Sequence, residues 1–148
     1  MYRKDEKGKL ITCAVVLIDK DGNILGCHAG KDPEKGFDFP KGCADEGETD
    51  LEAAKRELQE ETGIYLDDDE HIIDCGIHPH NTKKVIHLFL YKVSAFPDLQ
   101  YLRCTTFFKA FGKEYPEVNG YEVISKENRH KFNQVLQNKF EIIDKHNC

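Results

Sequence analysis

Residues 42–64 read GCADEGETDLEAAKRELQEETGI, and this stretch decides most of what the sequence predicts. It holds eight acidic and two basic side chains, a balance of −6. The other 125 residues carry 19 charges of each sign, so these 23 residues account for the whole formal net charge of −6. A charge cluster is most often a solvated helix face. The spacing of the acids therefore has to decide between a plain surface and a site.

The same stretch predicts a helix with a clear start and a clear end. Thr49 and Glu52 fit the capping-box pattern at the start of a helix, and Gly63 suits its C-terminal end. Between them, three apolar residues recur at i, i+3 and i+7 and would face a core: Leu51, Ala54 and Leu58. The acids lie largely off this stripe.

Three of these acids share one surface of the predicted helix. Glu57 and Glu61 are four residues apart, and Glu57 and Glu60 are three apart. Like charges at these spacings repel one another, whereas a divalent cation among them would relieve the repulsion. Mg²⁺ and Mn²⁺ prefer such oxygen ligands. Arg56 points elsewhere on the helix and could reach back to Glu48.

The pattern Gly42-x₅-Glu48-x₇-Arg56-Glu57-Leu58-x-Glu60-Glu61-x-Gly63-Ile64 matches the Nudix box without a deviation. The chain therefore resembles the Nudix hydrolases, which cleave a nucleoside diphosphate linked to another group. The resemblance implies that Glu57 and Glu61 are the principal metal ligands, and that Glu60 is a further ligand or holds metal-bound water. It also implies that the Gly42 carbonyl joins the metal site and that Glu48 and Arg56 form a structural ion pair. Mg²⁺ or Mn²⁺ is the cofactor expected.

The general base is open at this point. In some family members it is a carboxylate outside the box, in a loop near the last strand. Glu117 occupies the matching place, and Glu122 is the runner-up. A box residue such as Glu57 could serve instead.

The substrate class rests on weaker marks. Pro79 lies fifteen residues after Ile64, which resembles the mark of ADP-ribose pyrophosphatases. The run Phe39-Pro40-Lys41-Gly42 resembles the entry to the box in dinucleoside polyphosphate hydrolases and in RNA 5′-pyrophosphohydrolases, and Lys41 could touch a phosphate. We expect ADP-ribose and related molecules, with diadenosine polyphosphates or FAD as further substrates. An adenine ring would need an aromatic surface, for which the candidates are Phe37, Phe39 and Tyr121; His78 and His80 could also line the pocket.

The rest of the chain predicts one α/β domain over residues 1–148, with a loose terminus at residues 1–9. Strands are expected at residues 10–18, 23–28, 37–39, 72–77, 85–93 and 121–124. No element is assigned to residues 96–120. Ser125 could cap a C-terminal helix on an i, i+3, i+4 pattern: Phe132, Val135 and Leu136. Together with the resemblance, this order indicates an α/β/α sandwich with a mixed sheet, a catalytic loop and helix, and a C-terminal helix.

The composition indicates the cell compartment and the binding partners to expect. No apolar run approaches the roughly 20 residues of a membrane span, and the N-terminus has no signal-peptide pattern. Six cysteines without C-x-x-C pairs or zinc-finger spacing favour free thiols in the cytoplasm. The acidic balance argues against a stable nucleic-acid complex. A small nucleotide is the partner expected, and a homodimer is left open. The alternatives are an RNA 5′-end pyrophosphohydrolase and a catalytically silent nucleotide-binding sensor.

Overall fold

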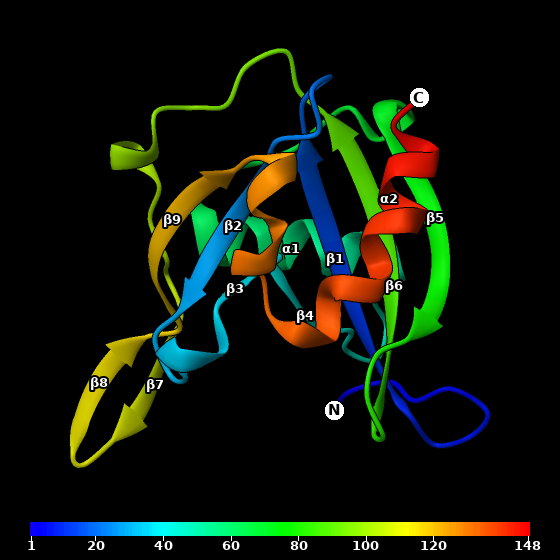
Figure 1. Ribbon diagram of the computed structural model, residues 1–148. Helices are drawn as coiled ribbons and strands as arrows, with labels where there is room; N and C mark the ends of the chain where they lie inside the picture. Colours follow the sequence, from blue (N-terminus) through cyan, green and yellow to red (C-terminus); the bar gives the residue numbers. More distant parts are fainter.

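The computed structural model describes residues 1–148, with the exception of the Pro33 side chain, and has a mixed sheet between two helical layers (Figure 1). Helix α1 (Asp50–Thr62) covers one face of the sheet, and α2 (Phe140–His146) covers the other. The strands of the main sheet are β1 (Leu10–Ile18), β2 (Ile24–Ala29), β3 (Phe37–Asp38), β4 (Lys41–Cys43), β5 (Ile72–Pro79), β6 (Lys84–Lys92) and β9 (Val118–Ile124). The expected α/β/α sandwich is confirmed.

Strand β1 lies in the middle of the sheet, and both of its faces are buried. Ala14, Val16 and Ile18 belong to the core under α2, whereas Cys13, Val15 and Leu17 belong to the core under α1. This is the alternation of a strand between two layers. Along its length β1 pairs in parallel with β6, and every other pairing in the sheet is antiparallel.

The other edge of β1 is shared by two strands. Its end at Ile18 pairs with Ile24 of β2, whereas its middle pairs with β4, where Cys13 faces Gly42. Strand β2 continues along β9 instead. The sheet therefore opens between β2 and β4, beside the C-terminal part of α1.

A second, two-stranded sheet projects from the body (Figure 1). Its strands β7 (Phe107–Ala110) and β8 (Lys113–Pro116) lie in the segment to which the sequence assigned no element. Short 3-10 helices lie at Pro33–Lys35, Asp69–His71, Leu99–Tyr101, Lys126–Lys131 and Gln134–Lys139. In the part of the chain that the structure describes, no helix is both long and apolar enough to cross a membrane.

The loose terminus expected at residues 1–9 stays a prediction, although Arg3 donates its backbone N–H to the Ala44 carbonyl and Tyr2 forms a bridge with Asp45. The prediction for the C-terminus needs correction. The α-helix at the C-terminus begins only at Phe140. Phe132 is extended because it bridges to Phe37 of β3, and this pairing interrupts the expected helix.

Candidate active site

The centre of the site is a close approach between β4 and α1. Gly42 lies in β4, and a Cβ atom there would overlap the carboxyl carbon and both carboxyl oxygens of Glu57. The Glu57 carboxyl therefore rests directly on the backbone of the loop that precedes the helix. Thr49 and Glu52 hold the start of that helix in the predicted capping box, with hydrogen bonds of 2.8 and 3.1 Å.

Glu57 and Glu61 form an acidic pair, in which Glu61 is buried and Glu57 is partly exposed. Glu61 is 7% exposed, shares a side-chain hydrogen bond with Glu57, and accepts a 3.4 Å hydrogen bond from the Lys41 backbone N–H. Burial raises the pKa of the Glu61 carboxyl well above its usual range, and the hydrogen bond and charge of Glu57 raise it further. Burial also raises the pKa of Glu57. Two acids this close share a proton unless a cation lies between them.

The residues of this pair fit a divalent metal ion. They offer carboxylate oxygens from adjacent helical turns beside a glycine backbone, and the neighbouring cationic side chains do not fully balance their negative charge. Hard oxygen ligands of this type suit Mg²⁺ and Mn²⁺.

Arg56 differs from its predicted orientation. It forms the expected ion pair with Glu48, with Nε and Nη2 each 2.8 Å from a carboxylate oxygen. It does not point away from the other acids, because Nη1 also contacts Glu57 at 2.9 Å and Glu60 at 3.0 Å. Glu60 is thus held by Arg56. Among the residues that the structure describes, no group of three His, Cys, Asp or Glu side chains is arranged to hold a metal.

A cavity of about 150 Å³ opens beside this pair, in the gap between β2 and β4. Glu61, Glu117 and Lys41 all line it, and Lys41 also lines a second cavity of about 540 Å³. The Lys41 Nζ lies 3.2 Å from Asp38, and the two residues line both cavities. The structure therefore brings together three residues predicted from distant parts of the chain.

The two candidate bases outside the box are in different situations. Thr106 donates a 3.1 Å hydrogen bond from its hydroxyl to Oε2 of Glu117, beside the cavity. Glu122 pairs instead with Lys131 at 2.6 Å, and it does not line the cavity that holds Glu61. The geometry favours Glu117.

Two of the predicted aromatic residues, Phe37 and Phe39, pack against the core, and their assignment to substrate binding stays a prediction because Phe39 also lines the cavity of Glu61. Phe39 is 1% exposed, and its ring centroid lies 5.4 Å from that of Phe132. Phe37 packs against the same core and against His28. Alternation along the strand puts both rings on one face and Asp38 on the other. Sequence reasoning missed Asp38, although this alternation was the signal that could have found it.

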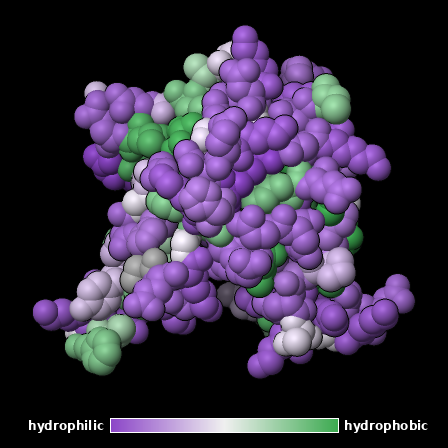
Figure 2. All heavy atoms as spheres, viewed as in Figure 1, coloured by the Kyte–Doolittle hydropathy of each residue, from purple (hydrophilic) through white to green (hydrophobic). Residues whose placement is uncertain are grey.

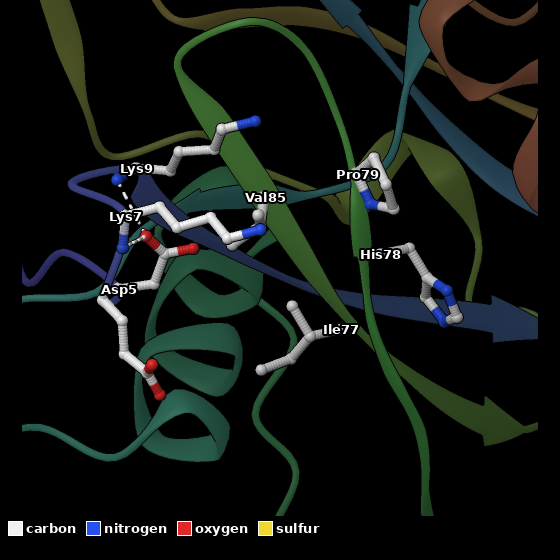
Figure 3. Close-up of a pocket in the computed structure, with 8 residues that line it drawn as sticks. Asp5, Lys7, Lys9, Ile77, His78, Pro79 and Val85 are labelled. Atoms are coloured by element: carbon white, nitrogen blue, oxygen red, sulfur yellow. Dashed lines mark hydrogen bonds between the residues drawn. The ribbon is translucent and has the colours of Figure 1, made fainter.

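Tyr121 contacts the candidate site, whereas Pro79 does not line its cavities. The Tyr121 hydroxyl donates a 2.5 Å hydrogen bond to the Glu61 carbonyl, so this residue supports the end of α1. Pro79 lines neither of the cavities beside Lys41. With His78 and Lys7 it lines a separate cavity of about 390 Å³ near the N-terminus (Figure 3).

The next residue along the chain, His80, does reach the larger of the two cavities beside Lys41. Burial and the charge of Lys41 lower the pKa of His80 to about 4. Its imidazole is therefore neutral at pH 7.

Comparison with known sequences gives one extended match and several local ones. Residues 8–100 match the profile of a protein family described as "NUDIX domain". An uncharacterized 17.7 kDa protein of Enterobacteria phage T4 is 26% identical over 126 residues, covering 80% of this chain and 83% of that protein. The RNA pyrophosphohydrolase of Caulobacter vibrioides is 52% identical over 52 residues, but this match covers only 34% of this chain and 30% of that enzyme.

Comparison with solved structures shows the same fold. The NUDIX domain of Shewanella oneidensis NrtR, complexed with ADP ribose, has a TM-score of 0.69 at 14% identity and covers 97% of this chain and 94% of its own. A bifunctional NMN adenylyltransferase/ADP ribose pyrophosphatase from Francisella tularensis, complexed with AMP and a Mn ion, has a TM-score of 0.67 at 19% identity. That match covers 95% of this chain and 42% of the Francisella protein.

Proposed function

The chain belongs to the Nudix hydrolase family, and we propose that it uses a divalent cation to hydrolyse the diphosphate linkage of nucleoside diphosphate derivatives. One observation carries the proposal: the Glu57 carboxyl lies against the Gly42 backbone, and its neighbour Glu61 lines the cavity shared with Lys41 and Glu117. Two carboxylates that could bind a metal, a cation and a third carboxylate therefore surround one small space.

Glu57 and Glu61, with the carbonyl of Gly42, would hold Mg²⁺ or Mn²⁺, and Glu60 would join them if Arg56 released it. When bound, such an ion neutralises a diphosphate and lowers the pKa of water for attack on phosphorus. The ion pair of Glu48 and Arg56 keeps the loop before α1 in place, because Arg56 also donates a 3.2 Å hydrogen bond to the Cys43 carbonyl.

The remaining residues supply binding and proton transfer. The Lys41 ammonium, which borders both cavities, would contact a phosphate oxygen. Glu117 would accept the proton of the attacking water at Oε1, because Thr106 occupies Oε2. Phosphoryl transfer needs mostly this kind of positioning and charge stabilisation.

We favour ADP-ribose and related molecules as substrates, with diadenosine polyphosphates and FAD as further ones. The two similar structures solved with ADP ribose or with AMP and Mn support this choice. We also propose a cytoplasmic location and a single catalytic domain over residues 1–148. A homodimer and the absence of a stable nucleic-acid complex remain predictions.

RNA 5′-end pyrophosphohydrolysis is the second candidate. Its support is the local identity of 52% to an RNA pyrophosphohydrolase. A triphosphorylated RNA and ADP-ribose compared at equal concentration would separate the two, and a higher kcat/KM on RNA would replace ADP-ribose as the preferred substrate.

The test is a substrate panel in ¹⁸O-labelled water with Mg²⁺ or Mn²⁺, read by the identity and labelling of the products. Glu57→Gln and Glu61→Gln should each lower turnover by about 1,000-fold, since the metal supplies several kcal/mol of transition-state stabilisation. Glu141→Gln is the matched control, because Glu141 is exposed on α2, on the opposite face of the sheet from α1. Near-normal turnover in either box variant would contradict the assignment. No turnover of any substrate by the native protein would favour the nucleotide-binding sensor.

A further inference from the structure

The hairpin of β7 and β8 continues the wall of the candidate active site. Its last ladder pair is Phe107 with Pro116, and beyond it the Glu117 N–H donates a 3.0 Å hydrogen bond to the Thr106 carbonyl. The Thr106 hydroxyl then meets the Glu117 carboxylate on one face of this ribbon. That carboxylate lines the cavity of Glu61.

An aromatic pair lies on the same face of the ribbon. Phe108 and Tyr115 are directly opposite each other in the ladder, and each is two residues from Thr106 or Glu117. Side chains two residues apart on a strand point the same way, about 7 Å apart. The rings of Phe108 and Tyr115 are stacked, with centroids 5.7 Å apart and planes at 28°.

One ring of the pair is exposed to solvent, and the other packs against the protein. Tyr115 is 38% exposed. Phe108 lies against the loop at Gly30, where its Cε1 is 3.7 Å from the position a Cβ would take. The hairpin stands clear of the main body (Figure 1), and its tip forms an isolated hydrophobic patch (Figure 2). The ring stack is thus supported by the Gly30 loop, and Glu117, two residues from Tyr115, lines the cavity.

From this placement we infer that Phe108 and Tyr115 form a stacking site for the nucleobase of the substrate, an assignment that rests on the proposed function. A nucleotide whose phosphate lies at Glu117 and Lys41 would carry its base onto these rings. Stacking on an aromatic face tolerates every base. We therefore expect the pair to raise affinity for adenine, guanine and pyrimidine nucleotides alike. The sequence offered the same role to Phe37, Phe39 and Tyr121.

Fluorescence provides a test that is independent of catalysis. The sequence contains no tryptophan, so Tyr115→Trp creates a unique probe. AMP and ribose 5-phosphate are the two products of ADP-ribose cleavage, and only AMP has a base. AMP should quench the tryptophan saturably, whereas ribose 5-phosphate should not. Phe107→Trp is the matched control, because Phe107 is 55% exposed on the opposite face of the same hairpin, and it should not be quenched saturably.

Steady-state kinetics separates stacking from a merely structural role. Tyr115→Ala should raise the KM for ADP-ribose by about 10- to 100-fold with little change in kcat. Tyr115→Phe keeps the ring and should restore the native KM. A structural role would instead move Glu117 and lower kcat.

The two proposals fail in different ways. Quenching by AMP without any diphosphate hydrolysis would leave the stacking site standing and reject the proposed function. Hydrolysis without quenching of the Tyr115→Trp probe, together with an unchanged KM in Tyr115→Ala, would reject the stacking site alone. Equal quenching of the probes at positions 107 and 115 would also overturn it.

Discussion

Gly42→Ala tests whether the contact between β4 and α1 sets the position of Glu57. The new methyl group would overlap all three carboxyl atoms of Glu57. Ordinary carbon contacts need about 3.5–4.0 Å, so the carboxyl has to move by more than 1 Å, roughly 1.5 Å. Since it lies at the end of a flexible side chain, it can move without unfolding β4.

The expected magnitudes differ sharply between stability and activity. Replacing a strand glycine with alanine lowers the entropy cost of folding by about 0.5–1 kcal/mol, which offsets the cost of moving one side chain. The free energy of unfolding should therefore change by no more than about 1 kcal/mol. A displacement of about 1 Å in a catalytic group costs on the order of 100-fold in rate. We expect kcat/KM for ADP-ribose to fall by about that factor, and Mn²⁺ binding to weaken as well.

Gly120→Ala is the matched control. Gly120 also lies in a strand, but a Cβ there would meet only the His28 Cβ, at an ordinary 3.6 Å. Urea unfolding, calorimetric titration with Mn²⁺ and initial rates would be measured on both variants. If Gly42→Ala kept native kcat/KM and native Mn²⁺ affinity, the Glu57 carboxyl could not be the ligand that we propose.

Two further predictions concern stability. Asp144→Asn should lower the free energy of unfolding at pH 7 by about 2–3 kcal/mol, because it leaves the buried Arg129 guanidinium without its bidentate partner at 2.7 and 2.8 Å. The Arg129 hydrogen bonds lower the folded-state pKa of Asp144. The loss of unfolding free energy in Asp144→Asn should therefore be complete above about pH 5 and disappear as the pH falls through the folded-state pKa of Asp144. Urea unfolding of both proteins between pH 3 and pH 7 measures this loss. A loss that stays constant over that range would contradict the reasoning. Phe39→Ala should lower the free energy of unfolding by about 3–5 kcal/mol in the same assay, because the Phe39 ring fills the core. A small loss of stability with a large rise in KM would instead indicate that Phe39 contacts the substrate.

The sequence predicts the box helix well because several local signals agree there. The capping box at Thr49, the stop at Gly63 and the buried residues Ala54 and Leu58 all appear as the pattern requires. The orientation of Arg56 was predicted less well. Its guanidinium has five donors, and only the fold shows that it uses them on Glu57 and Glu60 as well as on Glu48.

The aromatic hairpin escaped prediction because its turn uses an unusual residue. Phe111 and Gly112 both have positive φ, at 53° and 75°. Tight hairpin turns of this kind normally have Asn or Asp at the first position, and a bulky residue there is rare. A pattern search for turn residues therefore passes over residues 107–116. The stacking site that we infer lies in this segment, so the missing turn signal also concealed a candidate binding residue.

The acids of residues 42–64 also divide into two groups that only the fold can separate. Glu48 accepts two hydrogen bonds from Arg56, which lower its pKa, so its charge is already balanced. The pKa values of Glu57 and Glu61 are raised instead, chiefly by burial. Arg56 donates two hydrogen bonds to Glu48 but only one to Glu57, at 2.9 Å, so the pair of Glu57 and Glu61 has less positive charge beside it than Glu48 has. A divalent ion at Glu57 and Glu61 would do for this pair what Arg56 does for Glu48, and it would explain why the chain keeps its excess negative charge in this segment.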